Sequence, residues 1–201
     1  SDDPRQPLMD WLRSKDNPFF AKTAVNRIWG HLLGRGIVDP IDDFRATNPP
    51  SNPALLAALT DEFIAHHFDV GHLIRTIMTS RTYQLSSAPN DTNRDDDSNF
   101  SHALIRRLSA EQLADSFSHV LGAKLDFGGY PKGTRAAQLA GVRSFRRRES
   151  SPSSGDQLLT MFGKPPRLQA CECERSDDPT LSQTFQLVSG PILNELLALD
   201  D

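Results

Sequence analysis

The sequence predicts an all-α fold: an irregular multi-helix domain with long ordered loops and little or no β-structure. Helix-start signals recur along the chain, in which Asn, Asp or Ser precedes an apolar run. After these starts, apolar residues return at the three- and four-residue spacing of a helix that is buried on one face. No segment alternates between apolar and polar residues with the period of two that a half-buried strand requires.

The first long helix is predicted after Asn17-Pro18, where an N-cap residue precedes a proline at the first helical position. Its apolar residues fall on one stripe: Phe20, Ala24, Ile28 and Leu32. The helix should end at Gly34-Arg35-Gly36, because glycine adopts the left-handed conformation of a helix C-terminus without strain.

Three more helices begin with similar signals. Asn52-Pro53 combines a cap with a helix-starting proline, and Asp69 provides the cap of the next helix. Ser109 and Gln112 have the spacing of a capping box, in which each side chain bonds the backbone of the other residue. This box predicts a helix over about residues 110–121.

The remaining segments combine loops with shorter helices. Ser86 to Asn99 is polar and should form a long surface loop, and Gly122 to Gly155 has little helix-forming pattern. A short helix is predicted over Asp156 to Phe162. Asp178-Pro179 should begin another helix, which Ser189-Gly190-Pro191 ends before a last helix starts.

With 201 residues, the chain is long enough for one domain with a real core. We expect residues 1–201 to form a single helical domain. Because the chain begins at Ser1 without an initiator Met, we also expect it to be a fragment of a larger multidomain protein. The predicted core consists of Phe20, Ile28, Trp29, Leu55, Leu59, Phe63, Ile74, Ile77, Leu113, Phe117, Leu181 and Phe185.

Charge and hydropathy exclude two classes of partner. The chain has 26 acidic and 22 basic residues, a net charge of -4 and a pI near 5.8. General nucleic-acid binding or binding to anionic membranes needs a basic excess, so neither is expected. No apolar run approaches the ~20 residues of a membrane-spanning helix.

Ordered strings along the chain carry a family resemblance: Asp16 to Ala21, Val25 to Trp29, Gly34 to Val38, Asp42 to Arg45, Asn48 to Pro53, His72 to Arg75, Ser80 to Ser86, Arg106 to Glu111 and Phe162 to Ser176. Together they resemble the planctomycete-specific domain of unknown function that is family fifteen-fifty-three of the unknown-function series. The resemblance covers about Pro7 to Leu196 and implies a large exported protein (periplasmic or at the cell surface) that often also carries a cytochrome-c-like domain. It implies no particular reaction, and the family's domain usually continues past Leu199 with more helix.

No cofactor is expected in this chain. It lacks the C-x-x-C-H motif that attaches haem covalently, so any haem should belong to another domain of the parent protein. The expected partners are other domains of the same polypeptide.

Cys171 and Cys173 are the only cysteines of the chain and stand one residue apart. An exported location, which the resemblance implies, permits a disulfide between them. A bridge over this spacing needs a tight backbone turn and would be strained, hence labile and open to redox chemistry. The alternative, which we favour, is two reduced buried cysteines or a purely structural link.

Glu172, Glu174 and Arg175 flank these cysteines. Two carboxylates could perform acid–base chemistry if their surroundings separated their pKa values. We favour a structural polar network, in which the carboxylates form partly buried ion pairs with distant arginines. The candidate arginines of this network include Arg27, Arg106 and Arg107.

The other groupings of chemically active residues are weaker. His66 and His67 diverge on a helix and the remaining histidines are scattered, so no metal site is predicted. Asp91, Asn93, Asp95 and Asp97 imitate alternate positions of a calcium loop, but the glycine and the final glutamate of that motif are missing. Arg143 and Arg146 to Arg148 could meet a sulfated polysaccharide, although an exposed loop is the simpler interpretation.

Two hypotheses about function remain open. The first is a non-catalytic module that scaffolds or docks other domains of a large exported protein. The second is part of a redox or hydrolytic enzyme that acts on polysaccharide, with its site around Cys171 to Arg175. We favour the first, because no complete catalytic set is visible in the sequence.

Overall fold

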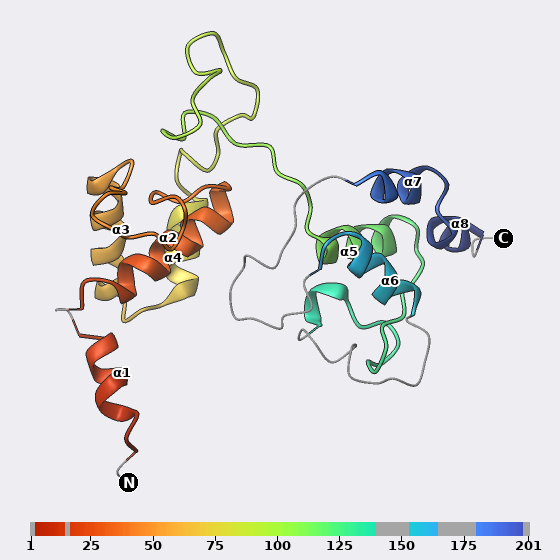
Figure 1. The fold of residues 1–201 in the computed structure, drawn as a ribbon, viewed down its shortest axis with the longest axis horizontal. Helices are drawn as coiled ribbons and strands as arrows, with labels where there is room; N and C mark the ends of the chain where they lie inside the picture. The colour runs from red at the N-terminus through yellow and green to blue at the C-terminus, as the bar shows by residue number, and fades with distance from the viewer. Residues whose placement is uncertain (1–2, 15–16, 140–152, 165–179, 199–201) are drawn as a thin grey trace. The chain divides into compact units, whose positions relative to one another are not determined.

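The computed structural model describes residues 3–14, 17–139, 153–164 and 180–198. These ranges contain helices, turns and loops but no β-strand, which confirms the predicted all-α class. The helices are α1 (Gln6–Leu12), α2 (Phe20–Leu33), α3 (Pro53–Ala65), α4 (Val70–Met78), α5 (Ala110–Val120), the 3₁₀ helix η1 (Ala136–Gln138), α6 (Ser154–Met161), α7 (Leu181–Ser189) and α8 (Pro191–Leu197) (Figure 1). None of the described helices combines the length and hydrophobicity that crossing a bilayer requires.

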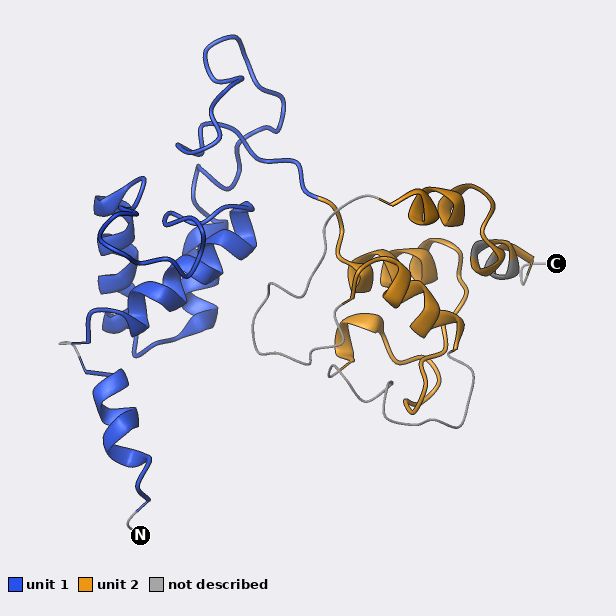
Figure 2. Cartoon of the chain, viewed as in Figure 1, with its two compact units in different colours: residues 1–106 blue, residues 107–201 orange. Residues whose placement is uncertain are grey.

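The chain divides into two compact units, Ser1–Arg106 (unit 1) and Arg107–Asp201 (unit 2) (Figure 2). Each unit has a hydrophobic core of its own. In unit 1 the buried apolar residues come from α2, α3, α4 and the segment after α2, and in unit 2 from α5, η1, α6, α8 and the loop after α5. The prediction that residues 1–201 form a single domain stays a prediction.

Side-chain caps begin α3 and α4 where the sequence predicts them, whereas α1 was not predicted. Asn52 accepts a hydrogen bond from a backbone N–H in the first turn of α3, and Asp69 accepts one from His72 N at 3.1 Å at the start of α4. The predicted start of α2 at Asn17-Pro18 is two residues too early, because Phe19 is the N-cap residue and the helix begins at Phe20, whose N–H donates to Asn17 Oδ1 at 2.9 Å. These oxygens satisfy N–H groups that have no partner within their own helix.

The core of unit 1 uses a different stripe of α2 from the one that the sequence predicts. Trp29 is buried as predicted, and Ala21 and Val25 lie on the same inward face. The prediction that Phe20 belongs to the core is wrong, because its side chain is partly exposed and its ring lies at the edge of the core, 5.8 Å from the ring of Phe68. The inward face is therefore shifted by one residue, which corresponds to a rotation of about 100°. The buried apolar residues of unit 1 are Ala21, Val25, Trp29, Ile37, Val38, Leu56, Leu59, Phe63, Leu73 and Ile77.

Unit 2 begins with α5, and its predicted capping box is confirmed. Ser109 Oγ accepts from Gln112 N at 3.2 Å, and Gln112 Oε1 accepts from Ser109 N at 2.9 Å. The next helix, α6, starts two residues earlier than predicted because Ser153 provides its cap. The buried apolar residues of unit 2 are Ala110, Ala114, Ala123, Leu125, Phe127, Ala136, Leu158, Leu159 and Ile192.

The start of α7 differs from the prediction. Asp178-Pro179 lies outside the described residues, and a capping box formed by Thr180 and Gln183 begins the helix at Leu181. The predicted core positions Leu181 and Phe185 are wrong, since both side chains are mostly exposed. The physical reason is that α7 turns its glutamines, and not its apolar residues, toward its own unit.

Candidate functional site

The cysteine segment that the sequence singles out lies outside the described residues; it comprises Cys171, Glu172, Cys173, Glu174 and Arg175. The basic run over residues 143–148 also lies outside them. Of the arginines assigned to the same polar network, Arg27 and Arg106 belong to unit 1, and Arg107 is the exposed first residue of unit 2. The described contacts of Arg27 and Arg106 lie within unit 1, so the joint network of these residues stays a prediction.

Arg27 forms a bidentate ion pair with Asp42. Its Nε and Nη2 atoms donate to the two carboxylate oxygens of Asp42 at 2.8 and 2.6 Å. The pair joins α2 to the loop that follows it, and both side chains are about half exposed. Water screens such a pair, so its contribution to stability is about 0–1 kcal/mol. Its role is to hold the loop against the helix.

Arg106 closes the C-terminal end of α2. Its two terminal nitrogens donate to His31 O at 2.6 Å and to Leu32 O at 2.7 Å. Carbonyls in the last turn of a helix have no intrahelical partner, so a guanidinium placed there satisfies them and interacts favourably with the helix dipole. Gly34 ends the same helix with φ +90°, and a Cβ added there would collide with the stem of Arg106.

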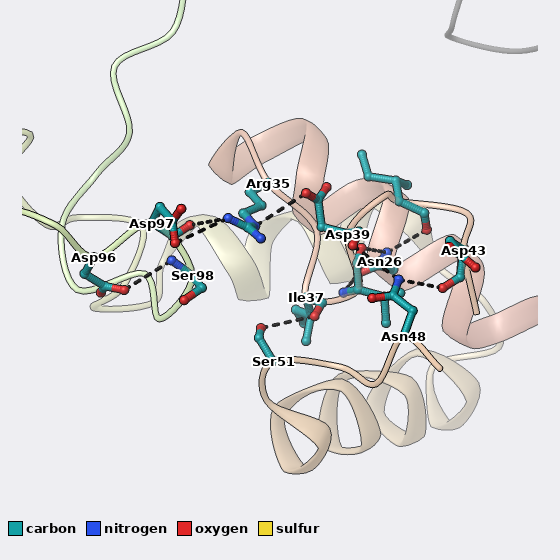
Figure 3. Close-up of polar contacts among 12 residues, drawn as sticks. Asn26, Arg35, Ile37, Asp39, Asp43, Asn48, Ser51, Asp96, Asp97 and Ser98 are labelled. Carbon is teal, nitrogen blue, oxygen red and sulfur yellow. Dashed lines mark hydrogen bonds and ion pairs between the residues drawn. The ribbon is translucent and has the colours of Figure 1, made fainter. Parts of the chain in front are cut away.

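Asn26 is the buried centre of a polar network in unit 1 (Figure 3). Its Nδ2 donates to Val38 O and to Ile41 O, both at 2.8 Å, and its Oδ1 accepts from Val38 N at 2.9 Å. One side-chain amide therefore replaces the backbone partners that this irregular segment lacks. Gly36 makes the close packing feasible, because a Cβ there would meet both the Asn26 amide and Val38 O.

The neighbouring polar residues in Figure 3 also bond the backbone. Asn48 Nδ2 donates to two loop carbonyls at 2.9 and 3.2 Å, and both the N–H and the hydroxyl of Ser51 donate to Ile37 O. Arg35 donates to Asp97 O at 3.0 Å and so ties the long loop before α5 to the end of α2. In this network, polar side chains bond the backbone and thereby position the chain.

Asp96 organises the long loop that the sequence compares with a calcium site. Its carboxylate accepts from the backbone N–H groups of Ser98, Asn99 and Ser101 at 2.8–3.1 Å. Hydrogen bonds from the Ser101 side chain, and then from the Asn99 backbone, hold the pKa of Asp96 well below its ordinary value. Among the residues that imitate calcium ligands, Asn93 accepts from a backbone N–H and Asp97 pairs with an arginine. Asp96 and Asn93 thus bond groups within the loop, and Asp97 connects the loop to Arg35.

An apolar hollow of about 350 Å³ lies in unit 1 where α1 meets the start of α2. Aromatic side chains of Trp11, Phe19 and Phe20 line it, and Arg27 contributes to its wall. Thr23 and Asn17 are its other polar lining residues. The lining includes no carboxylate, histidine or cysteine, so the side chains of this hollow do not assemble an acid–base pair.

A cluster of ionisable residues forms where α3 turns into α4. The imidazole rings of His66 and His72 stack with centroids 3.7 Å apart and planes 11° from parallel. Glu62 Oε1 lies 2.8 Å from His72 Nε2 and 3.4 Å from His66 Nδ1. The hydrogen bond from His72 is the main cause of a lowered pKa of Glu62. Sequence reasoning missed this cluster, because it compared His66 with its neighbour and treated His72 as isolated.

α7 has an inverted polarity, because its apolar residues lie on the exposed face and its glutamines on the face toward unit 2. Leu181, Phe185 and Val188 fall on one face of the helix, and they are 77%, 67% and 80% exposed. On the opposite face Gln183 Nε2 donates to the backbone carbonyl that ends α6, at 3.1 Å, and Gln186 is buried. The helix therefore packs on unit 2 with its glutamines and leaves its apolar face uncovered by the described residues of that unit.

Comparison with known proteins gives one result. A family model described as PSD1, protein of unknown function (DUF1553), matches residues 4–199, a range that includes residues of both units. The match confirms the family that the sequence resembles. No curated protein and no solved structure matches the chain.

Proposed function

The chain belongs to the PSD1 family of proteins of unknown function (DUF1553), and on this premise we propose that it is a non-catalytic scaffolding or docking module. The docking surface is the apolar face of α7, formed by Leu181, Phe185 and Val188. Its partner is another domain of a longer polypeptide that contains this chain. The inverted polarity of α7 is the observation that carries the proposal.

The energetics of α7 support a covered face. Full burial of a Val, Leu or Phe side chain is worth about 1.5–3 kcal/mol each, whereas a hydrogen bond such as that of Gln183 contributes about 1 kcal/mol. A helix of nine residues has little stability of its own in water. A partner that covers Leu181, Phe185 and Val188 would therefore supply most of the stabilisation available to α7.

The polar groups of unit 1 support the non-catalytic part of the proposal. Asn26 and Arg106 direct their hydrogen bonds to backbone groups, and Arg27 pairs with a loop carboxylate. These groups close helix ends and hold loops, which are scaffold roles. The enzymatic alternative centres on Cys171 to Arg175, outside the described residues, and no described contact favours it.

The same proposal includes the setting that the family resemblance implies. The parent is a planctomycete protein that is exported to the periplasm or the cell surface, and it also carries a cytochrome-c-like domain. The cytochrome-c-like domain is the first candidate to cover α7, and any haem resides there.

Hydrogen exchange of α7 tests the docking surface. Amide exchange over residues 180–197 should be fast in the 201-residue chain and at least about tenfold slower in the longer polypeptide, because a docked helix opens less often. Val188→Ser should reverse this protection. Val120→Ser is the matched control, since Val120 is also an exposed helical valine, at 79%. Equal protection of α7 in both proteins would contradict docking.

A separate assay distinguishes the enzymatic alternative. The longer polypeptide and its Cys171→Ser and Glu174→Gln variants are screened for hydrolysis of polysaccharides and for thiol–disulfide exchange. We expect no activity that depends on either residue. An activity that both substitutions abolish, in proteins that keep their helical content, would replace the docking proposal for this chain with an enzymatic one.

A further inference from the structure

The α3–α4 corner gathers three potential metal ligands from a short stretch of sequence. Glu62 and His66 are one helical turn apart at the end of α3. His67 and Phe68 then adopt left-handed backbone conformations, with φ of 55° and 62°, and reverse the chain direction. Asp69 caps α4 and bonds the N–H of His72, which brings His72 back onto the last turn of α3.

The three ligand atoms lie close enough for one ion. One nitrogen of each histidine and one oxygen of Glu62 all lie within 4.8 Å of one another. Zinc binds nitrogen and oxygen at about 2.0–2.2 Å, so ligands in neighbouring coordination positions stand roughly 3–3.5 Å apart. Side-chain rotations would close this difference, and the exposed side chain of His66 has solvent to rotate into.

A backbone hydrogen bond already orients His66 for such a role. Its Nδ1 lies 3.0 Å from Glu62 O and 3.4 Å from Glu62 Oε1. In the tautomer that carries its proton on Nδ1, the ring donates to that carbonyl and Nε2 has the lone pair for a metal ion. Histidines that bind metals usually donate their other N–H to a carbonyl or carboxylate in this way. Imidazole lone pairs lie in the ring plane and the two planes are 11° from parallel, so metal binding requires His66 to rotate out of the stack until its ring nitrogen points at the ion that His72 and Glu62 would hold.

We propose that Glu62, His66 and His72 form a binding site for a late first-row divalent metal ion, foremost Zn²⁺. Two imidazoles and one carboxylate suit Zn²⁺, Ni²⁺ or Cu²⁺, whereas Ca²⁺ and Mg²⁺ require more oxygen ligands. The three side chains are 30–44% exposed, so an ion can enter from solvent and water can complete its coordination. The bound ion would join α3 to α4, and this role is independent of docking through α7.

Calorimetric titration of tag-free protein with ZnCl₂ tests the site. Cys171 and Cys173 are both replaced by Ser, because thiolates also bind zinc. We expect one ion per chain. His72→Gln and Glu62→Gln should each weaken binding at least about tenfold. His119→Gln is the control, since His119 is an exposed histidine near the end of α5. Absence of saturable binding, or equal binding by all variants, would overturn the proposal.

Nuclear magnetic resonance of the chain with Cys171→Ser and Cys173→Ser, and with all histidines intact, provides a readout that does not depend on how the ligand variants fold. On addition of zinc, the imidazole signals of His66 and His72 should shift together and saturate at one equivalent. The signal of His119 should stay in place. Shifts confined to other histidines, or spread evenly over all six, would reject the assigned ligands even if an ion binds.

Discussion

Replacement of Asn26 by alanine should destabilise unit 1 more than any other single loss of a polar side chain in Figure 3. The side chain is fully buried and makes three hydrogen bonds, of 2.8, 2.8 and 2.9 Å, to the backbone of the segment after α2. Each lost hydrogen bond costs about 1 kcal/mol, and the buried N–H of Val38 would add a desolvation penalty of about 1–3 kcal/mol. The sum for Asn26→Ala is about 4–6 kcal/mol.

Urea denaturation followed by tryptophan fluorescence measures this loss, because both tryptophans, Trp11 and Trp29, belong to unit 1. With a urea dependence of about 1–3 kcal/mol per M, the midpoint of Asn26→Ala should fall by at least about 1 M. Asn48→Ala is the matched control. Asn48 also donates to two backbone carbonyls, but it is only half-buried, so its loss should cost about 1 kcal/mol.

Asn26→Asp adds a pH dependence with a definite sign. The carboxylate would face the carbonyls of Val38 and Ile41 in a buried site, so its pKa in the folded state should rise above the ordinary value of about 3.9. The folded variant then binds more protons than the unfolded chain, and its stability relative to wild type should increase as the pH falls. Equal midpoints for Asn26→Ala and Asn48→Ala, or a pH-independent deficit of Asn26→Asp, would refute this account of the network.

Three further predictions concern local structure. Gly34→Ala should lower the free energy of unfolding by about 1–2 kcal/mol in the same urea assay. The reason is that residue 34 has φ +90° and the added Cβ would strike the Arg106 stem. An unchanged midpoint would argue against a left-handed cap. Ser109→Ala should lower the free energy of unfolding by about 1 kcal/mol, measured by urea denaturation followed by circular dichroism. Because the two residues form one capping box, Gln112→Ala should cost less in the Ser109→Ala background than in the wild-type protein. Additive losses would disprove the reciprocal bonds. Because the pKa of Asp96 is lowered in the folded state, its carboxylate stabilises the loop fully above about pH 3.9. This stabilisation is lost as the pH falls toward the folded-state pKa of Asp96. Amides of the loop should therefore lose protection only in acid, whereas Asp96→Asn should lack part of that protection at neutral pH, and identical protection profiles would contradict the assigned role.

The helix caps show what can be predicted from short stretches of sequence. Asn52, Asp69 and Ser109 each bond a backbone N–H three residues ahead, so every atom of the interaction is specified within one helical turn. The all-α class follows from the same local rules. For this reason the sequence predicted these three helix starts. It missed α1, placed the starts of α2 and α6 two residues away from where they lie, and did not consider the box of Thr180 and Gln183 that begins α7.

The candidate sites depend on contacts between distant residues. Arg106 bonds carbonyls of α2 that stand 75 and 74 residues earlier, and Arg27 pairs with Asp42 fifteen residues later. Sequence patterns identify these arginines as notable but do not identify their partners. The stack of His66 on His72 likewise depends on a reversal of the chain at two left-handed residues that are not glycines, which no turn rule predicts.

By itself, the sequence determined the helical class and the starts of α3, α4 and α5, because capping bonds and apolar spacing act within a few residues. The family followed from ordered strings of residues along the whole chain. Only the tertiary structure decided which face of each helix is buried. α2 turns Ala21, Val25 and Trp29 inward, although the neighbouring stripe through Phe20 is also apolar, and α7 leaves Phe185 in solvent. Burial is the outcome of packing between segments that lie far apart in the chain, and the periodicity of one helix cannot specify which neighbour it will meet.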